Sequence, residues 1–87
     1  MNTSKVWYVT GASQGLGLIL VKKLLENGYR VAATSRDAHT LSQAVGLIDK
    51  NRFLSLTVDL NNQDCINDSV QQTLATFGRI DVVVNNV

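Results

Sequence analysis

Thr10–Gly17, which reads TGASQGLG, is the stretch that decides the fold. It follows a short run of β-branched and aromatic residues at 5–9 and precedes residues 15–27, whose apolar side chains recur at helical spacing. A glycine-rich turn between a strand and a helix lets the backbone approach a ligand closely. The helix N-terminus then offers N–H groups and a positive dipole end to a phosphate. The stretch therefore predicts a phosphate-binding loop.

The three glycines of this loop have separate expected roles. Gly11 turns the chain tightly off the strand, Gly15 lets the backbone reach a pyrophosphate, and Gly17 lets the helix lie close to the sheet. Ser13 and Gln14 add side-chain donors. The spacing Gly-x3-Gly-x-Gly differs from the general Gly-x-Gly-x-x-Gly fingerprint, and no Lys-Ser/Thr pair marks a P-loop. A glycine-rich turn that binds nothing is the alternative, but the flanking strand and helix favour dinucleotide binding.

Strand and helix patterns alternate along the rest of the chain. Strands are expected at 5–9, 30–35, 53–58 and 80–85, and helices at 15–27, around 38–50 and from 63 to 77. Strands joined by helical crossovers are parallel, and the crossovers are right-handed. The pattern predicts an α/β fold, a Rossmann-type doubly wound parallel sheet with four strands in the order 3-2-1-4. Ligands of such sheets bind beyond the carboxyl ends of the strands.

Length and composition limit the other possibilities. The 87 residues fit one domain, 1–87, and 45% of them are hydrophobic, which suffices for a core. A net charge of +1 gives no reason to expect nucleic acid or an anionic membrane as a partner. No apolar stretch approaches the roughly 20 residues of a membrane span, and residues 1–9 do not resemble a signal peptide.

Cysteine and histidine are scarce. Cys65 is the single cysteine, so an internal disulfide is excluded and a reducing, cytoplasmic location is expected. His39 is the single histidine and is expected to face solvent. Without a His/Cys cluster, no metal site is expected.

Further motifs follow the other strands. Ser35-Arg36 ends the second strand, Val58-Asp59-Leu60 ends the third, and residues 77–86 read FGRIDVVVNN. Together with the Thr-Gly-x-x-x-Gly-x-Gly loop, these motifs closely resemble the short-chain dehydrogenase/reductase family in its single-domain form. The resemblance covers the whole chain. It implies an oxidoreductase that transfers hydride between a nicotinamide cofactor and a small carbonyl or alcohol substrate, and a homo-oligomeric parent protein.

The resemblance also implies a cofactor site. The resemblance gives Gly11, Ser13, Gln14, Leu16, Asp59, Leu60 and Asn86, and the arguments from the loop and from the end of the second strand add Gly15, Gly17, Ser35 and Arg36. Within this set, Asp59 accepts a hydrogen bond from the adenine amino group beside the Leu60 backbone. The backbone of Asn86 contacts a ribose, whereas Asn85 stabilises the strand. The alternative for Asp59 is a helix-capping carboxylate.

The chain departs from the family where catalysis is concerned. Val87 follows the two asparagines in place of the family's Ala-Gly. No Tyr-x-x-x-Lys exists, because Ala12 lies four residues after Tyr8 and Ala33 four residues after Tyr29. In the family, that lysine lowers the pKa of the tyrosine, which exchanges a proton with the substrate oxygen. The chain therefore has no catalytic residue of its own, and we expect it to be inactive alone.

The choice between NADP and NAD depends on the end of the second strand. A carboxylate about 20 residues beyond the loop would accept the ribose hydroxyls of NAD and repel a 2′-phosphate. Ser35 lacks that charge, and the Arg36 guanidinium suits a phosphate, which favours NADP over NAD. Two observations weigh against NADP: Gln14 replaces a basic loop residue found in many NADP-preferring relatives, and Asp37 can pair with Arg36. The alternative for Arg36 is a solvated surface arginine.

The leading interpretation is the N-terminal segment of an NADP-dependent oxidoreductase. The alternatives are a non-enzymatic dinucleotide-binding or regulatory module, and a non-functional truncation. A downstream serine and Tyr-x-x-x-Lys in the reading frame would select the first, and measurable cofactor binding by a naturally 87-residue protein would select the second.

Overall fold

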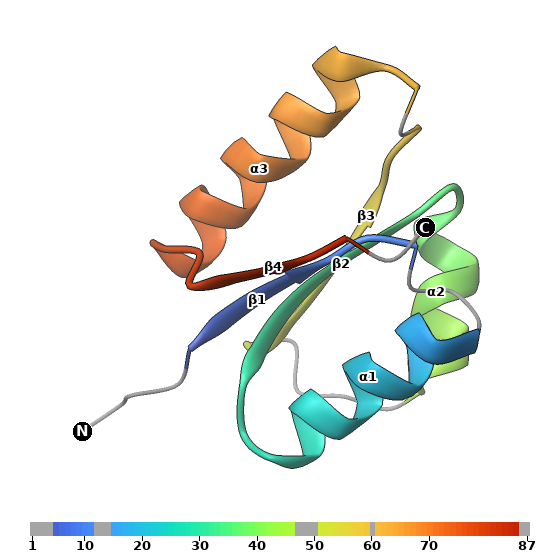
Figure 1. The fold of residues 1–87 in the computed structure, drawn as a ribbon, viewed down its shortest axis with the longest axis vertical. Helices are drawn as coiled ribbons and strands as arrows, with labels where there is room; N and C mark the ends of the chain where they lie inside the picture. The colour runs from blue at the N-terminus through green and yellow to red at the C-terminus, as the bar shows by residue number, and fades with distance from the viewer. Residues whose placement is uncertain (1–4, 12–14, 47–50, 60, 86–87) are drawn as a thin grey trace.

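A parallel sheet with helices on both faces forms the protein (Figure 1). The computed structural model describes residues 5–11, 15–46, 51–59 and 61–85. In chain order the elements are β1 (Val6–Val9), α1 (Gly15–Glu26), β2 (Arg30–Ser35), α2 (Ala38–Val45), β3 (Phe53–Thr57), α3 (Gln63–Phe77) and β4 (Val82–Val84). The four strands pair in the order β3-β2-β1-β4, all parallel. The predicted doubly wound sheet and its 3-2-1-4 order are confirmed.

Strand alternation divides the core between the two faces of the sheet. Val9, Val31 and Ala33 point to the face that α1 and α2 cover. Val6 and Tyr8 point to the opposite face, which α3 covers. Figure 1 shows α3 alone on its side of the sheet. Because both faces are covered, β1 reads as a continuous apolar run, VWYV, and the middle of β2 is the apolar stretch Val31–Ala33.

Two elements are shorter than the sequence suggests by more than one residue. The helix expected around 38–50 ends at Val45, because Gly46 leaves the helix with a φ of 91° while its N–H closes the last turn on the Ser42 carbonyl. Residues 47–50 lie outside the described residues. The strand expected at 80–85 is reduced to Val82–Val84, the three residues that pair with β1.

A carboxylate fastens the amino end of β4 to β1. Asp81 accepts a hydrogen bond from the Val6 N–H at 2.7 Å and forms an ion pair with Arg79. Two hydrogen bonds lower the pKa of Asp81 below its ordinary 3.8. The bond from the Val6 N–H has the larger effect, and the bond from Arg79 has the smaller. Nearby, the Arg30 guanidinium donates to the Phe77 carbonyl at 3.2 Å and lies 5.6 Å from the centre of its ring. These contacts hold the end of α3 and the start of β4 against the central strands.

Candidate dinucleotide-binding site

The carboxyl ends of the four strands open onto one edge of the sheet, as the sequence predicts. Thr10, which follows β1, donates its N–H to the Val84 carbonyl of β4 at 3.0 Å. Its hydroxyl donates to the Asn85 side-chain oxygen at 3.1 Å, so Asn85 stabilises the strand end as expected. On the other side, the Val58 N–H donates to the Ser35 carbonyl at 2.8 Å. This edge therefore assembles side chains that are as far as 75 residues apart in sequence.

Two glycines of the loop have positive backbone φ angles. Gly11 and Gly15 have φ angles of 61° and 66°, in the left-handed region that favours glycine. A Cβ added to Gly15 would meet no atom within 4 Å, so the space beside the first turn of α1 is open to a ligand. Gly17 is buried within α1. Ser13 and Gln14 lie outside the described residues.

The first turn of α1 has no acidic residue and carries an exposed apolar side chain. No acidic residue occurs in this turn, so no carboxylate competes with a phosphate for the positive end of the helix dipole. Leu16 is 79% exposed at the same place. An exposed leucine beside an anion site can pack against the apolar part of a nucleotide.

The turn after β2 presents Arg36 and holds its neighbours in hydrogen bonds. Ser35 is buried, and its hydroxyl donates to the Asp37 carbonyl at 2.7 Å and accepts from the Asp37 N–H at 3.1 Å. Asp37 is the N-cap of α2 and accepts from the N–H groups of His39 and Thr40. A further bond from the Thr40 hydroxyl is the largest cause of a lowered pKa of Asp37.

Arg36 and Asp37 do not pair, although they are adjacent. Capping satisfies the Asp37 carboxylate at the start of its own helix. Within the described residues the exposed Arg36 guanidinium has neither an ion-pair nor a hydrogen-bond partner. Arg36 is therefore available to an anionic ligand.

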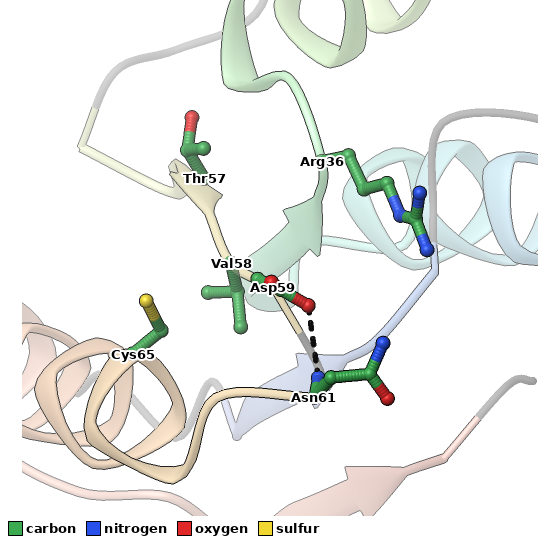
Figure 2. A pocket seen from close by; sticks show the side chains of 6 residues that line it. All are labelled: Arg36, Thr57, Val58, Asp59, Asn61 and Cys65. Carbon is green, nitrogen blue, oxygen red and sulfur yellow. Dashed lines mark hydrogen bonds between the residues drawn. The ribbon is translucent and has the colours of Figure 1, made fainter.

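A cavity of about 380 Å³ lies between the ends of β2 and β3 and the start of α3 (Figure 2). Its lining residues are Arg36, Thr57, Val58, Asp59, Asn61 and Cys65. Figure 2 shows Arg36 and Cys65 on opposite sides of Asp59. The cavity thus joins two predicted site residues, Arg36 and Asp59, which lie 23 positions apart in the sequence.

Asp59 does not cap α3. The N-cap is Asn62, whose side chain accepts from the N–H groups of Asp64 and Cys65. Asp59 instead accepts from the Asn61 N–H at 2.9 Å, which leaves carboxylate lone pairs for another donor such as an adenine amino group. The predicted site residues Leu60 and Asn86 lie outside the described residues.

Sequence reasoning missed Thr57, Asn61 and Cys65 as lining residues of this cavity. The sequence signal for Thr57 is its place two residues before Asp59, whereas its pairing with Ser35 depends on the strand register. That register is a three-dimensional fact which the motifs alone do not give. Asn61 lines the cavity from the turn before α3, and Cys65 lines it from the first turn of that helix.

Two other kinds of site find no support in the described part of the chain. No three histidine, cysteine or acidic side chains gather in a way that could hold a metal ion there. Among the helices of that same part, none combines the length and apolar character needed to cross a bilayer.

The residues present fit a dinucleotide. Open space beside Gly15 suits a pyrophosphate, the Asp59 carboxylate suits an adenine amino group, and the Arg36 guanidinium suits a further phosphate. All three features lie along the carboxyl edge of the sheet, which is where such folds bind nucleotides.

Comparison with known proteins agrees with this geometry. A family model described as short chain dehydrogenase matches residues 5–87. An oxidoreductase of Botryotinia fuckeliana, BOA17, is 37% identical over 83 residues, covering 95% of this chain and 30% of that protein.

Solved structures show the same likeness. A short chain dehydrogenase from Bacillus anthracis superposes with a TM-score of 0.87 at 33% identity, covering 95% of this chain and 34% of the other. A metagenomic short-chain oxidoreductase in complex with NADP superposes with a TM-score of 0.80 at 35% identity, covering 95% and 38%. The chain thus spans about a third of the length of the proteins it matches.

Proposed function

Because this chain belongs to the short-chain dehydrogenase family, we propose that it is the N-terminal, cofactor-binding part of an NADP(H)-dependent oxidoreductase. The full enzyme would transfer hydride between the nicotinamide and a small carbonyl or alcohol substrate. Its relatives are oxidoreductases, which favours this proposal over a non-enzymatic binding module. The residues for proton transfer to the substrate oxygen would come from outside residues 1–87, because these contain no Tyr-x-x-x-Lys.

One observation carries the cofactor preference: Arg36 lines the cavity beside Asp59 with no described partner, next to a serine in place of a carboxylate. A guanidinium so placed can bind a 2′-phosphate through two N–H groups. Ser35 adds no charge to repel that phosphate. The 35% identical metagenomic relative in complex with NADP supports the same choice.

The chain's own residues would then bind and orient the cofactor, which supplies the hydride chemistry when bound. The backbone around Gly11 and Gly15 would hold the pyrophosphate, with Ser13 and Gln14 as further donors. Asp59 and the Leu60 backbone would fix the adenine, and the backbone of Asn86 would contact a ribose. Leu16 and Gly17 belong to the same proposed site.

The test is Arg36→Ala in the full-length natural protein, with NADPH and NADH affinities measured by titration calorimetry. A hydrogen bond to a charged group contributes about 1.5–3 kcal/mol, so NADPH should bind about 10- to 150-fold more weakly. NADH affinity should change little. Lys22→Ala is the matched control, because it removes one positive charge from the exposed face of α1. Equal losses for both cofactors in Arg36→Ala would contradict the proposal.

A further inference from the structure

The turn that carries Arg36 is tied to the neighbouring strand. Thr57, the last residue of β3, accepts a hydrogen bond through its hydroxyl from the Ala38 N–H at 3.0 Å. Thr57 lies beside Ser35 in the parallel register of β2 and β3. Ser35 in turn holds Asp37 through both its N–H and its carbonyl. The backbone on the C-terminal side of Arg36 is therefore fixed by two hydroxyl groups.

These bonds also occupy the first donors of α2. The Ala38 N–H is bound by Thr57, and the N–H groups of His39 and Thr40 are bound by Asp37. A helix N-terminus whose first N–H groups are occupied has little left to offer a phosphate. Recognition of an anion at this edge then depends on the Arg36 side chain and on the position of the Arg36 backbone relative to the cavity.

Arginine is a poor recognition element unless its backbone is held, because ordering this flexible side chain costs rotamer entropy. No described residue fixes the guanidinium itself. The position of the Arg36 Cα relative to the cavity is thus set by the turn, and the turn is set by Ser35 and Thr57.

We propose that Thr57 is a positioning residue for cofactor choice: its hydroxyl holds the Arg36 turn against β3, so that the guanidinium reaches a 2′-phosphate in the cavity. This inference rests on the proposed NADP(H) preference and adds a residue to it. Thr57 touches the cofactor's binding cavity but acts through Arg36.

The chain offers a matched control two residues away. Ser42 of α2 and Ser55 of β3 form a hydrogen bond at 2.8 Å. Like the bond between Ala38 and Thr57, it joins α2 to β3, but it lies farther along both elements from Arg36. Removing the Ser55 hydroxyl therefore loosens the same helix and strand without releasing the Arg36 turn.

The hydrogen bond can be removed from either partner. Thr57→Val deletes the acceptor and keeps the shape of the side chain. Ala38→Pro deletes the donor, and proline is tolerated here because Ala38 is the first residue of α2 and Asp37 before it is extended, with φ −141° and ψ 103°. Thr57→Ser restores the acceptor. Two variants of such different chemistry keep the test valid if one of them fails to fold.

The experiment measures NADPH and NADH affinities of the full-length natural protein by titration calorimetry. Because a hydrogen bond contributes about 1 kcal/mol, Thr57→Val and Ala38→Pro should each lower the ratio of NADPH to NADH affinity about 2- to 10-fold. Thr57→Ser and Ser55→Ala should leave that ratio unchanged. In an Arg36→Ala background, Thr57→Val should not change it further, because the two residues act on the same phosphate.

Four results would overturn the inference. Equal weakening of both cofactors by Thr57→Val would show a merely structural role, as would an equal drop in the ratio for Ser55→Ala. If Arg36→Ala lowers the ratio while Thr57→Val and Ala38→Pro do not, Thr57 has no part in positioning and the proposed function stands. If Arg36→Ala itself leaves the ratio unchanged, the proposed cofactor preference fails.

Discussion

Replacing Gly15 with alanine separates the stability of the glycine loop from its ability to bind phosphate. Gly15 begins α1 with a φ of 66°, and an added Cβ would meet no atom within 4 Å. The substitution therefore causes no clash in the free protein. Its cost is conformational: a non-glycine residue in the left-handed region costs about 1–2 kcal/mol. A smaller unfolded-state entropy offsets part of this, so unfolding should become easier by about 1 kcal/mol.

Cofactor binding should suffer far more than stability. The open space beside Gly15 is the space that a pyrophosphate would occupy, and a methyl group there would hold the phosphate away from the backbone N–H groups. Loss of one hydrogen bond to a charged group costs about 1.5–3 kcal/mol, which corresponds to about 10- to 150-fold weaker binding. NADPH and NADH should lose affinity equally, because both carry the pyrophosphate.

Gly78→Ala is the control with the same strain. Gly78 caps α3 with a φ of 83°, and an added Cβ there also meets nothing within 4 Å. It precedes β4, at the edge of the sheet opposite the site. In the full-length natural protein, urea unfolding should show similar destabilisation for both variants, and calorimetry should show lost affinity only for Gly15→Ala. Unchanged affinity in Gly15→Ala, or an equal loss in both variants, would refute phosphate binding by this loop.

The remaining predictions concern Asp81, at the amino end of β4, and Val83 within that strand. The pKa of Asp81 is lowered from 3.8 in the folded protein, so its stabilising effect is complete above that pH and is lost as the pH falls through the lower folded-state value. Asp81→Asn should therefore flatten the acid-induced loss of stability followed by circular dichroism, and an unchanged acid profile would contradict this. Val83 is 63% exposed on β4, which within the described residues pairs on one side only, so the isolated 87-residue chain should self-associate. Val83→Lys should reduce that association in analytical ultracentrifugation, whereas an unchanged sedimentation profile would count against an edge contact.

Much of the fold was predictable because local patterns determine it. The apolar spacing of residues 15–27 and 63–77 predicts helices that the structure contains as Gly15–Glu26 and Gln63–Phe77. Alternation of strand and helix then leaves a parallel sheet as the solution. The overlong helix expected around 38–50 shows the limit of periodicity, since Gly46 ends the helix although apolar residues continue the pattern beyond it.

Contacts between distant residues were not predictable in this way. Asp81 had no role predicted from the sequence, yet it binds the N–H of Val6, 75 positions away. The possible pair of Arg36 and Asp37 was suggested by adjacency, but a carboxylate that precedes a helix binds its N–H groups in preference to a neighbouring side chain. The role of Thr57 required the register of β3 against β2. In each case the missing information was a contact or a strand register that only the folded chain shows.

Ser35 shows why cofactor choice and local structure cannot be varied separately at this edge. Its hydroxyl donates to the Asp37 carbonyl and accepts from the Asp37 N–H. A carboxylate in its place could accept from that N–H but, when ionised, has no proton to donate to the carbonyl. The residue that would favour NAD by its charge would therefore also break one of the bonds that hold the Arg36 turn. Under the proposed NADP(H) preference, the same hydroxyl removes a repulsive charge and keeps the turn in place, so that both effects act on the binding of one phosphate.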